Sequence, residues 1–197
     1  EQLTFSPGGK KREEWQRRLD SGKAQALLEI RNFTIDFAKI SRHSRNLVYG
    51  ADDGLFLWEL WRKSPEGFTA GICKSVEGKK ILEQYARTLE EIERPVLATN
   101  LEEFSDVIFD FVFFRNPVTT KESFVDFAEK VKNLKELYPE CKIIISQKIP
   151  AKAQCLASLI RGIYPQKSSS IDKIEKLETE FFTSKSEISW NQDDFIA

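Results

Sequence analysis

Apolar runs alternate with helical patterns five times along this chain, and this alternation most constrains the fold. The clearest run is 108–114 (IFDFVFF), which is apolar almost throughout, as in a strand that is covered on both faces. The other predicted strands are 47–49, 68–72, 96–98 and 142–146, and the predicted helices are 24–41, 54–63, 76–93, 122–137 and 152–161. The pattern predicts an α/β fold with a parallel sheet, right-handed crossovers and helices on both faces.

Two of the predicted helices carry long apolar stripes. In the helix 24–41, apolar residues recur at spacings of three and four, which predicts one buried face: Ala26, Ile30, Phe33, Phe37 and Ile40. In the helix 76–93, which Ser75 can cap, the predicted stripe is Leu82, Tyr85, Leu89 and Ile92.

A glycine-flanked acidic turn follows the first predicted strand. Gly50, Ala51, Asp52, Asp53 and Gly54 connect this strand to the next helix. Such a turn lets backbone N–H groups approach a ligand at the positive end of a helix. The alternative is an acidic first turn that only caps its own helix, and the residues alone leave both interpretations open.

Ligands of open parallel sheets bind beyond the carboxyl ends of the strands, beside the first strand. Because strand tips gather at one edge, we expect four distant segments to converge: 50–54, Cys73, Asn100 and Arg115-Asn116. Cys73 itself is more typical of a small buried apolar residue than of a nucleophile.

Composition excludes several classes of function. The chain has 197 residues with a formal net charge of −1, which gives no overall attraction to nucleic acid or to anionic membranes. It has three cysteines without paired spacing and one histidine, His43, so we expect no disulfide framework and no metal site. No apolar run approaches a membrane span and no signal peptide is visible, which predicts a cytoplasmic protein.

Over residues 24–161 the chain resembles a class I S-adenosylmethionine-dependent methyltransferase domain. NLVYGADDG is similar to the glycine-rich first motif of that family, and TAGICKS to the end of its second strand. VLATNLEEF resembles the third-strand segment that meets the adenine, and FDFVFFRNPV resembles the fourth-strand motif. Further along, KIPAKAQCLASLI is similar to a methyltransferase-like module fused to recombination-associated AAA+ ATPases of cyanobacteria.

The resemblance implies a three-layer Rossmann-like methyltransferase fold with a mostly parallel sheet, strand order 3-2-1-4-5 and an N-terminal helical extension. It implies that S-adenosylmethionine is bound by these residues: Gly50, Ala51, Asp52, Asp53, Gly54, Cys73, Lys74, Asn100, Leu101 and Arg115. Asn116, in a segment similar to the Asn-Pro-Pro-aromatic motif of methyltransferases that act on amino groups, is the implied catalytic residue. A turn after a strand is the plainer interpretation of that segment.

Several family anchors are changed. Val48 stands where the family has an acidic residue, Asp52 replaces the central glycine of the turn, and Cys73 replaces the acid that meets the ribose. Asn100 replaces an aspartate, which is a milder change. The implied function is transfer of a methyl group by direct in-line displacement to an acceptor that the sequence does not identify. The alternative is a degenerate, non-catalytic binding or interaction module linked to DNA replication or repair. A nucleotide-dependent oxidoreductase would require a glycine fingerprint that is absent here.

The ends of the chain are less patterned. Residues 1–23 are predicted to form an N-terminal arm in which Trp15 lies among arginines, as a solvated helix or as a contact with nucleic acid. Residues 24–197 are predicted to form a single methyltransferase-like domain whose part 166–197 is poorly defined or truncated, with a short strand at 188–190. Nucleic acid or an AAA+ ATPase is the partner class that these features suggest, and no membrane partner is expected.

Overall fold

A computed structural model describes residues 22–120, 123–149, 156–163, 169–184 and 193 of this chain. Its sheet has five strands, all parallel, in the order β3-β2-β1-β4-β5. The strands are β1 (Arg45–Tyr49), β2 (Phe68–Ile72), β3 (Val96–Ala98), β4 (Phe111–Arg115) and β5 (Lys142–Ser146). The predicted fold class and strand order are therefore confirmed, and the sheet is parallel throughout the described residues.

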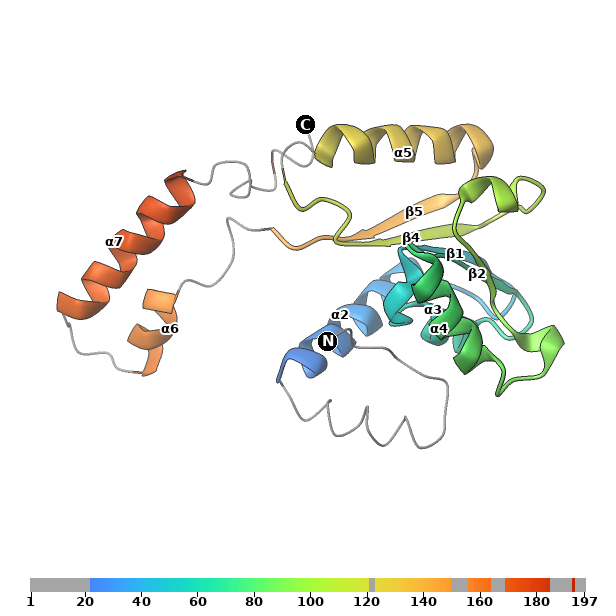
Figure 1. The fold of residues 1–197 in the computed structure, drawn as a ribbon, viewed down its shortest axis with the longest axis horizontal. Helices are drawn as coiled ribbons and strands as arrows, with labels where there is room; N and C mark the ends of the chain where they lie inside the picture. The colour runs from blue at the N-terminus through green and yellow to red at the C-terminus, as the bar shows by residue number, and fades with distance from the viewer. Residues whose placement is uncertain (1–21, 121–122, 150–155, 164–168, 185–192, 194–197) are drawn as a thin grey trace. The chain divides into compact units, whose positions relative to one another are not determined.

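Helices cover both faces of the sheet (Figure 1). The α-helices are α2 (Gly22–Ala38), α3 (Leu57–Lys63), α4 (Val76–Ala86), α5 (Ser123–Leu137), α6 (Leu156–Ile163) and α7 (Ser169–Ser184). Three short 3₁₀ helices are η1 (Ala51–Asp53), η2 (Glu91–Glu93) and η3 (Leu101–Phe104). Helices α2, α3 and α4 lie on one face, and the second half of α5 lies on the other (Figure 1). Just after α5, the hydroxyl of Tyr138 donates to the carbonyl of Phe104 over 2.8 Å.

The chain divides into two compact units. One comprises residues 1–115 and 131–146, and the other comprises residues 116–130 and 147–197. Within the second unit, Arg161 of α6 pairs with Asp172 and Glu175 of α7 at 2.8 and 2.7 Å. The single domain 24–197 stays a prediction. Residues 1–21 of the predicted arm 1–23 and the strand predicted at 188–190 lie outside the described residues, and the last two residues of that arm begin α2.

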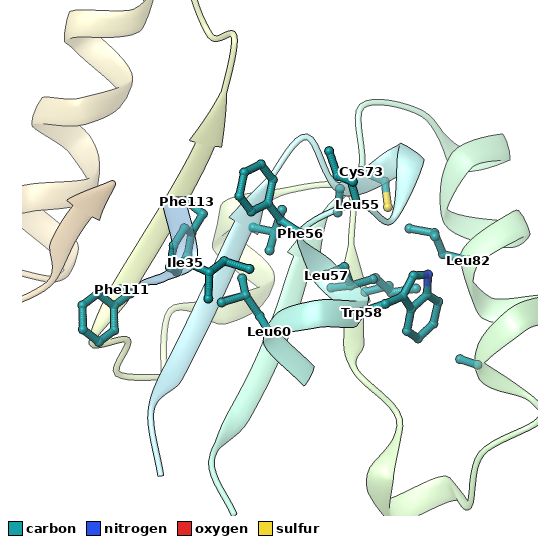
Figure 2. Close-up of a cluster of buried hydrophobic side chains, with 14 of the residues drawn as sticks. Ile35, Leu55, Phe56, Leu57, Trp58, Leu60, Cys73, Leu82, Phe111 and Phe113 are labelled. Atoms are coloured by element: carbon teal, nitrogen blue, oxygen red, sulfur yellow. The ribbon is translucent and has the colours of Figure 1, made fainter. Parts of the chain in front are cut away.

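The apolar core of the first unit forms between the sheet and helices α2, α3 and α4 (Figure 2). Phe113 of β4 and Leu57 and Leu60 of α3 are fully buried at its centre. Burying a side chain of this size contributes about 1.5–3 kcal/mol. Because this layer fixes β1 and β4 side by side, it positions the loops that leave their carboxyl ends.

The buried face predicted for the helix 24–41 is wrong. Phe33 and Phe37 are 75% and 70% exposed, and their rings stack on each other at 6.4 Å. Ala26 and Ile30 are exposed too, and Ile40 lies beyond the end of the helix and is half-buried. The helix instead buries a stripe with small and polar members: Ala24, Thr34, Ile35 and Ala38. Both stripes have helical spacing, and the more apolar stripe is the exposed one.

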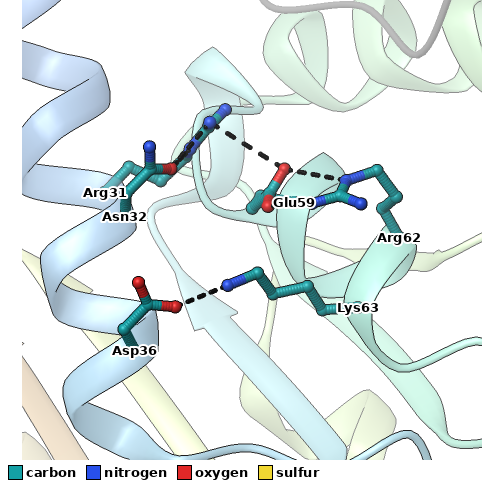
Figure 3. A network of polar contacts seen from close by, with 6 residues as sticks. All are labelled: Arg31, Asn32, Asp36, Glu59, Arg62 and Lys63. Atoms are coloured by element: carbon teal, nitrogen blue, oxygen red, sulfur yellow. Dashed lines mark hydrogen bonds and ion pairs between the residues drawn. The ribbon is translucent and has the colours of Figure 1, made fainter.

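Charged groups also join α2 to α3 (Figure 3). The nearly buried carboxylate of Glu59 lies 2.5 Å from a guanidinium nitrogen of Arg62 and 3.9 Å from one of Arg31. Burial lowers the pKa of Arg31, and the charge of Glu59 opposes this effect. Lys63 pairs with Asp36 at 2.6 Å. These pairs hold the polar side of α2 against α3.

Other boundaries differ from the predictions. The helix predicted at 76–93 ends at Ala86, so Ile92 lies in η2 and is exposed rather than part of a buried stripe. The fourth strand begins at Phe111 rather than at residue 108, because the backbone and side chain of Asp110 both bond to Arg45 and start the pairing there. Ile108 is consequently exposed. The strand 142–146 is correct in its bounds, but as an edge strand it is only partly covered.

Candidate functional site

The turn after β1 is a single 3₁₀ turn between two glycines. Gly50 and Gly54 have φ values of +78° and +69°, in the left-handed region that glycine adopts without steric cost. The N–H of Gly50 donates to the carbonyl of Ile72 over 2.9 Å, which ties the turn to the end of β2. β1 lies between β2 and β4, where the strand order reverses, and the predicted glycine turn follows the carboxyl end of β1 at this point.

Asp52 is directed toward the start of α4. Its carboxylate accepts the backbone N–H groups of Lys74, at 2.9 Å, and Ser75, at 3.3 Å. The hydroxyl of Ser75 in turn accepts the N–H of Gly78 at 3.0 Å and caps the helix. A Cβ added to Gly78 would lie 2.3 Å from Asp52 Oδ1, so only glycine leaves room for this carboxylate. Asp52 thus acts as an internal anion at the positive end of α4.

Asp53 is directed to the other side, toward β4. Its carboxylate pairs with the guanidinium of Arg115 and accepts the N–H of Leu55 at 3.0 Å. Burial raises the pKa of Asp53, and the positive charge of Arg115 opposes that rise. The two adjacent carboxylates therefore join the turn to β2–α4 and to β4 respectively.

Cys73 and Lys74 follow the end of β2. The thiol of Cys73 is buried, and burial together with the charge of Asp52 raises its pKa to about 12. It is a protonated, apolar group at neutral pH, in agreement with the interpretation of Cys73 as a small buried residue. The Lys74 side chain extends over the turn, since its Cε would be 3.1 Å from a Cβ placed on Gly50.

Asn100 caps the 3₁₀ helix that follows β3. Its side chain accepts the N–H of Glu103, and the Glu103 carboxylate accepts the N–H groups of Thr99 and Asn100 at 3.1 and 3.3 Å. These backbone bonds, first of all the one from Thr99, lower the pKa of Glu103. Leu101 is half-buried in the same turn. The oxygen of Asn100, which the resemblance assigns to the adenine, is therefore already engaged.

Asn116 directly follows Arg115 at the end of β4 and has φ +49°. Its side-chain oxygen accepts the N–H of Lys148 at 2.8 Å, within the second unit. The same loop is joined by Gln147, which bonds to both the N–H and the carbonyl of Val118. The geometry shows Asn116 as a loop-holding residue, and its catalytic role stays a prediction.

The structure thus brings together the turn 50–54, Cys73, Lys74 and Arg115 at one edge of the sheet. The sequence analysis missed two supporting residues, Gly78 and Glu103. The spacing Asn100-x-x-Glu103 is a capping-box pattern and could have been found. Nothing in the sequence marks Gly78, because its need arises only where Asp52 meets α4.

Within the described part of the chain, no cluster of three or more histidine, cysteine or acidic side chains could hold a metal ion. In the same part, no helix combines the length and the apolar character that a membrane span requires.

No protein-family model matches this sequence, and no curated protein matches it significantly. Among solved structures, the CcbJ methyltransferase from Streptomyces caelestis is similar with 14% identity and a TM-score of 0.48, over 64% of this chain and 53% of that chain. Magnesium protoporphyrin IX methyltransferase (ChlM) from Synechocystis PCC 6803 with bound SAH is similar with 16% identity and a TM-score of 0.49, over 81% and 74%. A cyclopropane-fatty-acyl-phospholipid synthase-like protein from Lactobacillus casei ATCC 334 is similar with 12% identity and a TM-score of 0.48, over 77% and 64%. The match to CcbJ spans about half the length of that protein.

Proposed function

We propose that this chain binds S-adenosylmethionine beyond the carboxyl ends of β1, β2 and β3 and transfers a methyl group to an acceptor that is still unidentified. The observation that carries the proposal is the turn Gly50–Gly54 at the reversal of strand order, with both glycines left-handed and with the Lys74 side chain lying over Gly50. The five-strand order and the resemblance of four strand-end segments support the same function.

The charges of this edge fit a cationic cofactor better than a phosphate-bearing one. A phosphate at the glycine turn after β1, where dinucleotide-binding folds hold it, would meet the carboxylate of Asp52. The nearby N–H groups of Lys74 and Ser75 at the start of α4 are already accepted by the same carboxylate. A sulfonium centre would instead gain from nearby negative charge, and the Lys74 ammonium, whose side chain extends over Gly50, would pair with the carboxylate of the same cofactor. This selectivity argues against the nucleotide-dependent oxidoreductase.

The polar anchors act differently from those of the family pattern. An ionised carboxylate offers about four lone-pair sites, so Asp52 can still accept a hydroxyl or ammonium hydrogen of the cofactor. This would replace the acid that is missing at Cys73. Because the Asn100 oxygen caps η3, its amide N–H₂ is the group left to donate to an adenine ring nitrogen. The groups that bind the cofactor would therefore differ from those of the family pattern: Asp52 would act for the acid missing at Cys73, and the Asn100 amide N–H₂ would act for its oxygen.

The sulfonium cofactor, when bound, supplies an activated methyl group. The protein's own contribution would be proximity and orientation, which suffice for a displacement without a metal or a strong base. Cys73 contributes no base, because its thiol stays protonated. The ion pair between Asp53 and Arg115 fixes the loop after β1 against the end of β4, where the acceptor would enter.

Calorimetric titration with S-adenosylmethionine, up to millimolar ligand, tests the proposal. We expect saturable binding to the wild-type protein and about tenfold weaker binding to Asp52→Asn, because a charge-assisted bond is lost. Asp126→Asn is the matched control, since Asp126 is exposed on α5. NADH and ATP should not bind. A flat response from folded protein would overturn the proposal and favour the non-catalytic binding module.

A further inference from the structure

A cavity of about 420 Å³ lies at the opposite end of the sheet from the glycine turn. Its wall is formed by the end of α3, the start of β2 and the loop from η2 to β3. β2 starts at Phe68, in this wall, and ends at Ile72, beside the turn. At about 3.3 Å per residue the two places are roughly 13 Å apart along the strand. The cavity is therefore separate from the proposed cofactor site.

The floor of the cavity carries polar groups that the protein leaves partly unsatisfied. Thr69 and Ser64 both line it and are at least 95% buried. Thr69 Oγ1 has no hydrogen-bond partner among the described residues, and neither has Oδ1 of its register neighbour Asn46. The amide nitrogen of Asn46 donates to the Ser64 hydroxyl at 2.9 Å. Native proteins rarely leave buried polar atoms without partners, so a group from outside the chain is expected to bond here.

The rim supplies an aromatic surface and a positive charge. Trp61 lines the cavity, and its indole N–H donates to the carbonyl of Glu93 over 2.5 Å, which fixes the ring between α3 and η2. Pro65 and Pro95 add further apolar surface. Arg94 donates its Nε to the carbonyl of Leu89, and its terminal nitrogens have no partner among the described residues. Arg62, by contrast, is already paired with Glu59.

We propose that this cavity binds a small planar aromatic molecule that carries one anionic group. The ring would lie against Trp61 and the prolines, a polar edge of the ring would bond to Thr69, and the anionic group would pair with Arg94. Thr69 Oγ1 is shielded from solvent in this structure, so the proposal requires side chains of the cavity wall to shift before a ligand can bond to it. Pockets for small ligands combine these features: apolar walls, few polar groups and a volume of some hundreds of Å³.

Titrations with adenosine 5′-monophosphate and with 4-hydroxybenzoate test this proposal. They are followed by calorimetry and by the NMR signal of the Trp61 indole N–H. Both probes carry a planar aromatic ring and an anionic group. The probe that binds shows whether the ligand of this cavity is a nucleotide or a simple aromatic acid. We expect at least one of them to bind and to shift the Trp61 signal. Inorganic phosphate alone should not bind.

Two variants separate binding from structure. Thr69→Val should weaken binding about tenfold, the effect of one lost hydrogen bond, and should not lower the melting temperature, because the hydroxyl has no protein partner. Arg94→Gln should weaken binding by a similar factor. The matched controls are Thr34→Val, a buried threonine on α2, and Arg87→Gln, outside this cavity. Neither control should change the affinity.

The proposal is overturned if neither probe shifts the Trp61 signal at 10 mM (on the order of the weakest specific binding), or if Thr69→Val binds as the wild type does. Asp52→Asn is expected to leave this affinity unchanged, so the result is independent of the cofactor proposal.

Discussion

At the scale of single residues, burial decides the chemistry of Cys73. Its pKa is raised to about 12 from an ordinary value of 9.0, so the folded protein keeps a proton that the unfolded chain releases. The stability gained from this proton is complete below about pH 9 and is lost as the pH rises toward 12. We expect the free energy of unfolding to fall by about 1 kcal/mol more in the wild type than in Cys73→Ala between pH 8 and pH 10. Urea unfolding of both proteins at both pH values measures this difference. An equal fall in the free energy of unfolding in the wild type and in Cys73→Ala would contradict the prediction.

The ion pair between Asp53 and Arg115 leads to a second prediction at this scale. Arg115→Gln leaves a largely buried carboxylate without its cation, so the free energy of unfolding should fall by about 2 kcal/mol at pH 7, less than for a fully buried pair. The pKa of Asp53 is already raised by burial, and it should rise further in this variant. Folding then favours the protonated acid, so the deficit should shrink as the pH is lowered toward 5.

Urea unfolding of Arg115→Gln at pH 7 and pH 5 measures that deficit. The double variant Asp53→Asn/Arg115→Gln is the control, because the neutral amide needs no cation, and it should recover much of the stability at pH 7. A deficit that grows toward acid pH would show that the carboxylate is not the cause.

At the scale of elements, the strands could be predicted and the orientation of α2 could not. The central strands of this sheet bury residues on both faces, so their existence could be predicted from their apolar runs. A helix has a choice of face. In α2 the aromatic stripe of Phe33 and Phe37 competes with the stripe of Ile35 and Ala38, and the partner that decides between them lies far along the chain. Arg31 and Asp36 of α2 then pair with Glu59 and Lys63 of α3 in the observed orientation.

The orientation of α2 predicts opposite results for two neighbouring substitutions. Ile35→Ala should lower the free energy of unfolding by about 2–4 kcal/mol, because it opens a cavity in the core. Phe33→Ala, which removes the larger side chain, should change it by less than about 0.5 kcal/mol, because that ring is exposed. Chemical denaturation of both variants measures the difference. A larger loss in Phe33→Ala would mean that the predicted aromatic face is the buried one.

The place of the candidate site could be predicted from the sequence, but the directions of its side chains could not. Parallel topology alone brings Gly50, Cys73 and Arg115 to one edge, so their convergence follows from the alternation of elements. The directions of Asp52 and Asp53 do not follow, because each depends on a partner more than twenty residues away in the chain. Local patterns therefore place the site, and long-range hydrogen bonds determine which atoms remain for a ligand.

At the scale of the whole molecule, the two units should differ in local stability. The central strands of the first unit carry fully buried residues such as Leu47 and Val112, and both pair with neighbours on two sides. In α7 of the second unit, Ile171 is buried while Leu177 and Phe181 are exposed, and its polar contacts with α6 include the surface ion pairs of Arg161 and the bonds from two backbone N–H groups of α6 to Glu178. Surface ion pairs contribute only about 0–1 kcal/mol each.

Native-state hydrogen exchange should therefore find β1 and β4 amides opening only with global unfolding, and α6 and α7 amides exchanging through smaller, local openings. Adding 0.5 M NaCl should speed exchange in α6 and α7, where screening weakens the pairs of Arg161, and leave β1 and β4 unchanged. Equal protection in both units would show instead that they unfold together as one cooperative domain.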